Sequence, residues 1–152
     1  MQVGDRIPDF ELLDQTGAPR SLGDLLAGGP VVLFFYPAAM TSGCTRESCH
    51  FRDLKAEFEA LGAQRVGISA DTVAKQAQFA DKHTFDYPLL SDPDREVAEI
   101  FGVKRSLGLL KVKRHTFVID TDRTLLAVIK SEVNMNTHAD KALEVLRGRA
   151  TA

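Results

Sequence analysis

Residues 31–51 read VVLFFYPAAMTSGCTRESCHF and describe a strand that gives way to a helix. Residues 31–36 are an apolar run, and a loop containing Pro and Gly follows it. Apolar residues then recur at helical spacing, at Phe51, Leu54, Phe58 and Leu61. The pattern predicts a buried strand, a loop and a helix over 44–61. Cys44 falls in the first helical turn, where unpaired N–H groups and the helix dipole favour a thiolate, the nucleophilic form.

The stretch also holds both cysteines of the chain, Cys44 and Cys49. Two unrelated cysteines that act as small buried hydrophobes are the simplest alternative. Against it, the two lie within six residues of each other. The first also follows a loop at a strand's end, where ligand sites of open α/β sheets cluster. The pair is therefore a candidate reactive site.

Length and composition indicate a single domain over residues 1–152. Hydrophobic residues make up 44% and charged residues 26% of the chain, and the formal net charge is -2. This charge favours neither nucleic acid nor an anionic membrane as partner. The first residues lack a signal-peptide pattern, and no apolar run is long enough to span a bilayer. A cytoplasmic location is the default, and there a close cysteine pair is typical of redox chemistry rather than a structural disulfide.

Strand and helix patterns alternate along the chain. An N-terminal hairpin is predicted over 10–13 and 20–22, and a second hairpin over 114–119 and 125–129. Further extended segments are predicted at 65–69 and 87–90, and helices at 72–83 and 94–101. A last helix is expected to open at a capping box formed by Thr137 and Asp140. The order predicts an α/β fold with a mixed central sheet flanked by helices.

The spacing of the cysteines has a mechanistic consequence. Residues five apart in an ideal helix lie roughly 8–9 Å apart at Cα, on different faces. A disulfide needs Cα atoms within about 7 Å of each other. Cys44 and Cys49 can therefore pair only if the first turns of the helix unwind. The sequence predicts a reduced helical state and a locally unwound oxidised state.

Several motifs in order resemble the peroxiredoxins. Pro37-x-x-x-Thr41-x-x-Cys44 is similar to their peroxidatic signature, and Cys44-x-x-x-x-Cys49 to the bacterioferritin-comigratory-protein (BCP) or PrxQ branch. The resemblance extends over nearly the whole chain. Its other motifs are Val3-Gly4-Asp5-x-x-Pro8-Asp9-Phe10, Asp14-Gln15-x-Gly17, Val66-Gly67-Ile68-Ser69, Tyr87-Pro88-Leu89-Leu90-Ser91-Asp92 and Arg114-x-Thr116-Phe117-Val118-Ile119-Asp120.

The resemblance implies a thioredoxin-like fold and a thiol peroxidase that reduces hydrogen peroxide and organic hydroperoxides. By matching positions, Cys44 is the peroxidatic nucleophile and Cys49 the resolving cysteine. Thr41 is expected to hydrogen-bond the thiolate and the attacking peroxide oxygen. Arg114 is expected to favour the thiolate and to stabilise charge on the peroxide, as fixed donors do for a developing charge.

Three further positions are assigned to substrate binding by the same resemblance. Pro37 shields the pocket from water, Gly43 belongs to its wall, and Glu47 orients the arginine. Departures from the branch pattern at Ala38, Ala39, Met40, Ser42 and Ser48 affect pocket polarity rather than the reaction. Met40 beside the pocket either favours bulky apolar hydroperoxides or simply packs.

The implied cycle needs no metal, haem or flavin. Cys44 becomes a sulfenic acid, Cys49 condenses with it, and an external dithiol, thioredoxin or a similar protein, restores both thiols. Because resolution occurs within one chain, a monomer is expected.

Other interpretations stay open. The pair could exchange disulfides with protein partners, or the fold could be a non-catalytic binding module. Cys44, Cys49 and His50 could bind a metal with His83 or His115, although their spacing fits no common zinc pattern. His138 is expected to be a surface or packing residue. A hydrolase built on Ser69 and Asp71 would lack the Gly-x-Ser-x-Gly motif.

Overall fold

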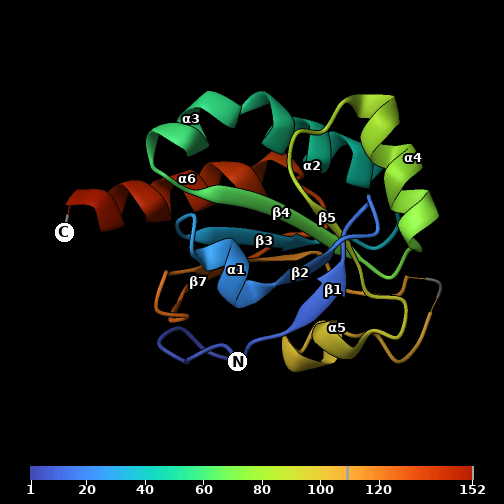
Figure 1. The fold of residues 1–152 in the computed structure, drawn as a ribbon, viewed down its shortest axis with the longest axis horizontal. Helices are drawn as coiled ribbons and strands as arrows, with labels where there is room; N and C mark the ends of the chain where they lie inside the picture. The colour runs from blue at the N-terminus through green and yellow to red at the C-terminus, as the bar shows by residue number, and fades with distance from the viewer. Residues whose placement is uncertain (109, 152) are drawn as a thin grey trace.

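The structure, a computed structural model, describes residues 1–108 and 110–151. Within these residues one twisted sheet of seven strands is flanked by helices on both faces (Figure 1). The strands are β1 (Glu11–Leu13), β2 (Pro19–Ser21), β3 (Val31–Phe35), β4 (Gln64–Ser69), β5 (Leu89–Ser91), β6 (His115–Ile119) and β7 (Leu125–Lys130). The helices are α1 (Leu22–Leu26), α2 (Ser42–Asp53), α3 (Lys55–Ala60), α4 (Val73–His83), α5 (Glu96–Ile100) and α6 (Asn136–Thr151).

The sheet is mixed, as the sequence predicts. Its strand order is β2-β1-β5-β4-β3-β6-β7. Strand β4 runs parallel to both β3 and β5, whereas β6 pairs antiparallel with β3 and β7. The expected N-terminal hairpin is formed by β1 and β2, and the second hairpin by β6 and β7. The carboxyl ends of the three parallel strands meet at one edge, where the cysteine loop leaves β3.

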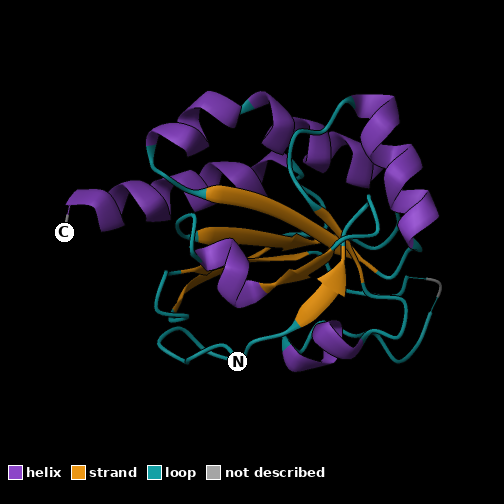
Figure 2. Cartoon of the chain, viewed as in Figure 1, coloured by secondary structure: helices purple, strands orange, loops and turns teal. Residues whose placement is uncertain are grey.

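Strand β3 lies inside the sheet, between β4 and β6, and both of its faces are buried. Val31, Leu33 and Phe35 belong to one core, which is covered by α1 and α5. Val32, Phe34 and Tyr36 belong to the other, which is covered by α2, α3, α4 and α6 (Figure 2). A strand covered on both faces needs a continuous apolar run rather than alternation. No helix of the described residues is long and apolar enough to cross a membrane.

The single helix expected over 44–61 is wrong. The helix begins at Ser42, ends at Asp53, and a second helix starts at Lys55. Between them Leu54 leaves helical geometry, with φ -93 and ψ 21. The buried guanidinium of Arg65 donates hydrogen bonds to the carbonyl oxygens of Phe51 and Arg52. These carbonyls at the end of the helix therefore have partners without a further helical turn.

Other boundaries differ by smaller amounts. The last helix begins at Asn136, so Thr137 lies inside its first turn and the expected capping box is wrong. Helix α1 has no counterpart among the predicted elements; Ser21 caps it by accepting a hydrogen bond from the Asp24 amide. The helix expected over 94–101 is shorter, because Arg95 adopts a left-handed φ of 57 before it begins.

The packing around β4 yields a first prediction. A Cβ atom at Gly67 would lie 2.8 Å from Leu89 Cδ2 and 3.0 Å from Phe34 Cζ. Gly67→Ala should therefore lower the free energy of unfolding by about 1–3 kcal/mol through overpacking. Urea denaturation measures it. Gly148→Ala is the matched control, because a Cβ there meets nothing within 4 Å. Equal stability of the two variants would contradict this tight packing around Gly67.

Candidate active site

Cys44 lies in the first turn of α2, as the sequence predicts, although the helix begins two residues earlier, at Ser42. Strand β3 ends at Phe35, the loop 36–41 turns back, and Thr41 occupies the N-cap position. The Cys44 side chain is fully buried beneath this loop. Its Sγ accepts a hydrogen bond from Nη2 of Arg114 at 3.3 Å. The thiol therefore meets a fixed cation as well as the amino end of a helix.

Arg114 reaches the site from the residue before β6. Strand β6 pairs antiparallel with β3, so the guanidinium approaches the cysteine loop from the neighbouring strand. Its Nη1 donates to Glu47 Oε1 at 2.9 Å, and its backbone amide donates to Glu132 Oε1 at 3.0 Å. Burial lowers the pKa of Arg114, but Glu47 and Cys44 outweigh it, and the pKa stays above its usual value. The guanidinium remains a permanent charge beside the sulfur.

Glu47 lies one turn after Cys44 on the same helix and is fully buried. Burial raises the pKa of Glu47 to about 8, against the lowering effect of Arg114. Among the described residues, its second oxygen, Oε2, has no hydrogen-bond partner. The carboxyl group thus contacts Arg114 through one oxygen.

His138 of α6 packs beside the site, a position that its expected role as a surface or packing residue did not specify. It is fully buried, and its Nε2 lies 2.7 Å from the Ser131 carbonyl oxygen. A carbonyl only accepts, so Nε2 carries the proton, and Nδ1 accepts from the Thr116 hydroxyl at 2.8 Å. Nε2 also lies 3.5 Å from Glu47 Oε2. The spacing of His138 from the buried residues Ala142 and Leu146 would have placed it on the buried face of α6.

The loop before α2 is held in a strained shape. Met40 has a φ of 70, a left-handed conformation that non-glycine residues rarely adopt. Two hydrogen bonds hold the backbone around it. The Thr41 hydroxyl donates to the Ala38 carbonyl at 2.7 Å, and the Ala39 amide donates to Asp71 Oδ2 at 2.7 Å. Thr41 therefore uses its proton within the loop, while its oxygen keeps lone pairs for a further donor.

Pro37 and Gly43 belong to the segment between β3 and Cys44. Pro37 is buried and is the second residue after the end of β3. A Cβ atom at Gly43 would lie 3.3 Å from Arg114 Nη2 and 3.5 Å from Met135 Sδ. Gly43 thus allows the guanidinium to pass close to the backbone of the first helical turn.

Cys49 lies on the same helix, five residues after Cys44, and is half-buried. Burial raises the pKa of its thiol. Both cysteines are free. The structure therefore holds the reduced helical state that their spacing predicts.

The arrangement of the described residues does not support the metal-site or hydrolase interpretations. The described residues hold no group of three or more His, Cys, Asp or Glu that could bind a metal. His50 instead pairs with Asp140 of α6 at 2.8 Å. Ser69 donates to Asp71 at 2.7 Å, in a contact that supports the cysteine loop.

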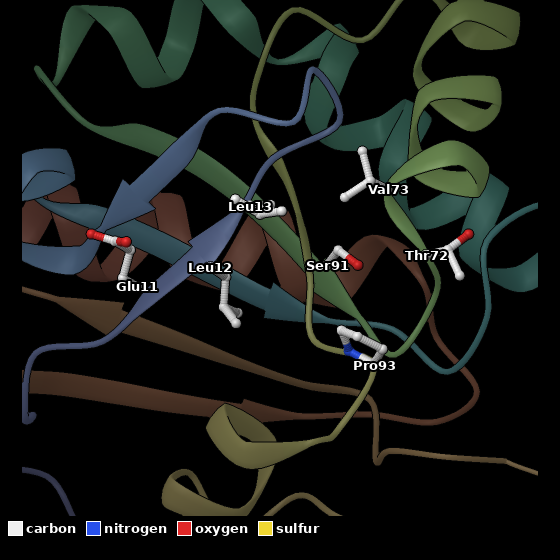
Figure 3. A pocket seen from close by; sticks show the side chains of 7 residues that line it. All are labelled: Glu11, Leu12, Leu13, Thr72, Val73, Ser91 and Pro93. Carbon is white, nitrogen blue, oxygen red and sulfur yellow. The ribbon is translucent and has the colours of Figure 1, made fainter.

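A separate groove of about 350 Å³ lies at the same edge of the sheet (Figure 3). Its walls come from β1, β5 and the start of α4. It is lined by Glu11, Leu12, Leu13, Thr72, Val73, Ser91 and Pro93. Asp71 connects it to the cysteine loop, since the Asp71 carbonyl accepts from the Ser91 hydroxyl at 2.5 Å. Neither cysteine lines it, so the groove is a neighbour of the reactive thiol rather than its pocket.

Known proteins are similar to this chain in both sequence and fold. The AhpC/TSA family model matches residues 3–128. The chain is 36% identical over 152 residues to peroxiredoxin Bcp of Bacillus subtilis, covering 97% of this chain and 96% of that one. The crystal structure of peroxidoxin BcpB from Mycobacterium tuberculosis is 64% identical, with a TM-score of 0.94 over 97% of both chains. Bacterioferritin comigratory protein of Xanthomonas campestris is 30% identical, with a TM-score of 0.85 over 93% of this chain and 92% of that one.

The fold and these relatives define a thiol peroxidase of thioredoxin-like fold. The chain belongs to the AhpC/TSA family of peroxiredoxins, in its BCP/PrxQ branch. The family resemblance read from the sequence is confirmed.

The raised pKa of Glu47 yields a prediction about stability. The folded protein holds this proton up to about pH 8, whereas a carboxyl of ordinary pKa, 4.5, releases it much earlier. The stabilisation that protonated Glu47 adds to the free energy of unfolding is thus fully present below about pH 4.5. It is lost as the pH rises to about 8, by at most about 1.4 kcal/mol per pH unit.

Glu47→Gln cannot titrate and keeps the side-chain shape, so it isolates this contribution. The free energy of unfolding of the wild type minus that of the variant should fall between about pH 4.5 and about pH 8. Urea denaturation at both pH values measures the difference. A difference that is constant or grows with pH would contradict the raised pKa.

Proposed function

We propose that Cys44 attacks peroxides and that Cys49 resolves the product within the same chain. The observation that carries the proposal is the hydrogen bond of 3.3 Å from Arg114 Nη2 to Cys44 Sγ, with Nη1 of the same guanidinium held by Glu47. A thiol that only exchanges disulfides needs no buried guanidinium fixed at its sulfur. A fixed guanidinium at this place supports peroxide reduction, because it stabilises the negative charge that develops on the peroxide oxygens.

In the first step the Cys44 thiolate attacks one peroxide oxygen. A sulfur–oxygen bond forms while the oxygen–oxygen bond breaks, so the sulfur is oxidised to a sulfenic acid. The other oxygen leaves with the electron pair and takes up a proton as water or an alcohol. Arg114 presents donors in a rigid fork that serve the sulfur and the departing oxygen. Thr41, whose hydroxyl donates to Ala38 rather than to Cys44, can still accept a hydrogen bond from the peroxide, while Gly43 leaves room for the guanidinium and Pro37 excludes water.

In the second step the Cys49 thiol condenses with the sulfenic acid. A sulfur–sulfur bond forms, and the sulfenic oxygen leaves as water. An external dithiol, thioredoxin or a similar protein, then takes over the disulfide and returns both thiols. We expect hydrogen peroxide and organic hydroperoxides as substrates. In support, the similar bacterioferritin comigratory protein of Xanthomonas campestris has alkyl peroxide reduction activity.

We further infer a monomer, a single domain over residues 1–152, and a cytoplasmic location. The monomer follows from resolution within one chain. The single domain is supported by the two cores, which share strand β3. The location is supported by two free cysteines in a close pair, which is typical of a reducing compartment.

Mass spectrometry tests the cysteine roles. Fully reduced protein treated with one equivalent of hydrogen peroxide should lose two hydrogens and yield a linked Cys44–Cys49 peptide. Cys49→Ser should stop at a sulfenic acid after one turnover, because nothing condenses with it. Cys44→Ser should not react. Two unmodified thiols in the treated wild type, or equal losses in both variants, would refute the assignment.

The role of Arg114 is tested by Arg114→Lys. Lysine keeps the charge but lacks the fork that binds Glu47 and Cys44 together. The second-order rate constant for peroxide should fall by about 10²-fold, as for the loss of one fixed donor. Stopped-flow kinetics measures it. Arg20→Lys is the matched control, since Arg20 forms its ion pair with Asp14 in the N-terminal hairpin. A rate equal to that of the control would remove Arg114 from the mechanism.

A further inference from the structure

The two ends of α2 are held in different ways, and the amino end is the weaker. Thr41 occupies the N-cap but makes no side-chain capping bond, since its hydroxyl donates to Ala38. The first turn carries no acidic residue to match the helix dipole. Among the described residues, the tertiary hydrogen bonds to the side chains of this half, at Cys44 and Glu47, both come from Arg114.

The carboxyl half is tied to the sheet by Tyr87, the second residue before β5. The Tyr87 hydroxyl donates to the Ser48 carbonyl oxygen at 2.6 Å. The ring is buried and packs against Phe34, whose ring stacks on Phe51 of α2 with centroids 4.1 Å apart. Tyr87 thus contacts the backbone one residue before Cys49.

Arg65 of β4 closes the same end of the helix. Its Nη1 donates to the Phe51 carbonyl at 2.9 Å and to the Arg52 carbonyl at 3.4 Å. Asp86 orients the guanidinium through two bonds, of 3.1 and 2.6 Å. The guanidinium also lies 5.1 Å from the Tyr87 ring centroid. Arg65, Asp86 and Tyr87 together form what we name the α2 clamp.

The peroxide chemistry acts on only one of these two halves. Oxidation removes the thiolate charge from Cys44, which weakens the bond from Arg114 and thereby loosens the amino half. The strained φ of 70 at Met40 lies directly before this half and is relieved when the turn opens. None of the clamp contacts involves Cys44 or Arg114, so they persist.

We propose that the α2 clamp stops the unwinding of α2 at Ser48 and holds Cys49 in place while Cys44 moves to it. This inference rests on the proposed function, in which the two cysteines form a disulfide. Tyr87 and Arg65 are positioning residues for the second step. A resolving thiol on a fixed backbone meets the sulfenic acid at a higher effective concentration than one on a melted segment.

The clamp defines a boundary that can be measured. Helical amides bond to the carbonyl four residues earlier, as Thr45 does to Thr41 and Leu54 to His50. If the helix opens as far as residue 47, the amides of residues 45–51 lose their partners. Those of residues 52–54 keep theirs. Amide hydrogen exchange of the oxidised protein, followed by NMR, should show protection lost up to Phe51 and retained from Arg52.

Tyr87→Phe removes the bond to Ser48 and keeps the ring. The rate constant of the peroxide step should stay within about twofold, whereas disulfide formation should slow by about five- to tenfold. Stopped-flow kinetics separates the two steps. More Cys44 should then reach the sulfinic acid at high peroxide, as mass spectrometry would record. Asp86→Asn, which loosens Arg65 from the partly exposed side, should act in the same direction with a smaller effect.

Ile119→Val is the matched control, because Ile119 is buried in the core on the other face of the sheet. It lowers stability without touching α2 and should leave both steps unchanged. The proposal is overturned if protection in the oxidised wild type is lost through Leu54, or if Tyr87→Phe forms its disulfide as fast as the wild type. A purely structural role for Tyr87 would slow the control and the variant alike.

Failure of the proposed function gives a different result. The wild type would then form no Cys44–Cys49 disulfide with peroxide. Diamide, an azo oxidant that takes up the two thiol hydrogens, makes the same disulfide without peroxide. The boundary at Ser48 can therefore be measured in either case.

Discussion

The buried guanidinium of Arg114 is the interaction on which the reactive end of the molecule depends. It lies between Cys44 and Glu47 and is almost inaccessible to solvent. A buried cation without partners would be costly, so the surrounding structure must supply acceptors in fixed positions. Glu47 supplies one from α2, and Glu132 fixes the backbone of the arginine itself. One side chain thereby couples the start of strand β6 to the reactive helix α2.

The burial of this cluster also explains its supporting residues. Glu47 is surrounded by protein, and on its far side His138 of α6 is held by Thr116 and Ser131. The strained loop at Met40 is kept in shape by Asp71 from the end of β4. Each supporting group comes from a different part of the fold, and Glu47 reduces the freedom of Arg114, which contacts the sulfur. The site is thus preorganised by the sheet, although its reactive atom lies on a helix.

Helix α2 combines two requirements that usually conflict. It must be ordered to present Cys44 to Arg114, and it must open for Cys44 to reach Cys49. The structure separates these requirements along the helix. The amino half depends on contacts that the chemistry itself alters, while the carboxyl half is anchored by Arg65 and Tyr87, which the chemistry does not touch. The break at Leu54 directly follows the carbonyl groups of Phe51 and Arg52, which accept hydrogen bonds from Arg65.

The sequence by itself determined the strand at 31–36, the two hairpins, the mixed sheet and the place of Cys44 in the first turn. These features depend on periodicity, turn residues and helix ends, which act over a few neighbouring residues. Family resemblance added Arg114 and Glu47. Only the tertiary structure decided the end of α2 at Asp53, the burial of His138 and the bond from Tyr87 to Ser48. Each of these depends on contacts between residues far apart in the sequence, such as Arg65 with Phe51, 14 positions away, and Tyr87 with Ser48, 39 positions away, which no local pattern encodes.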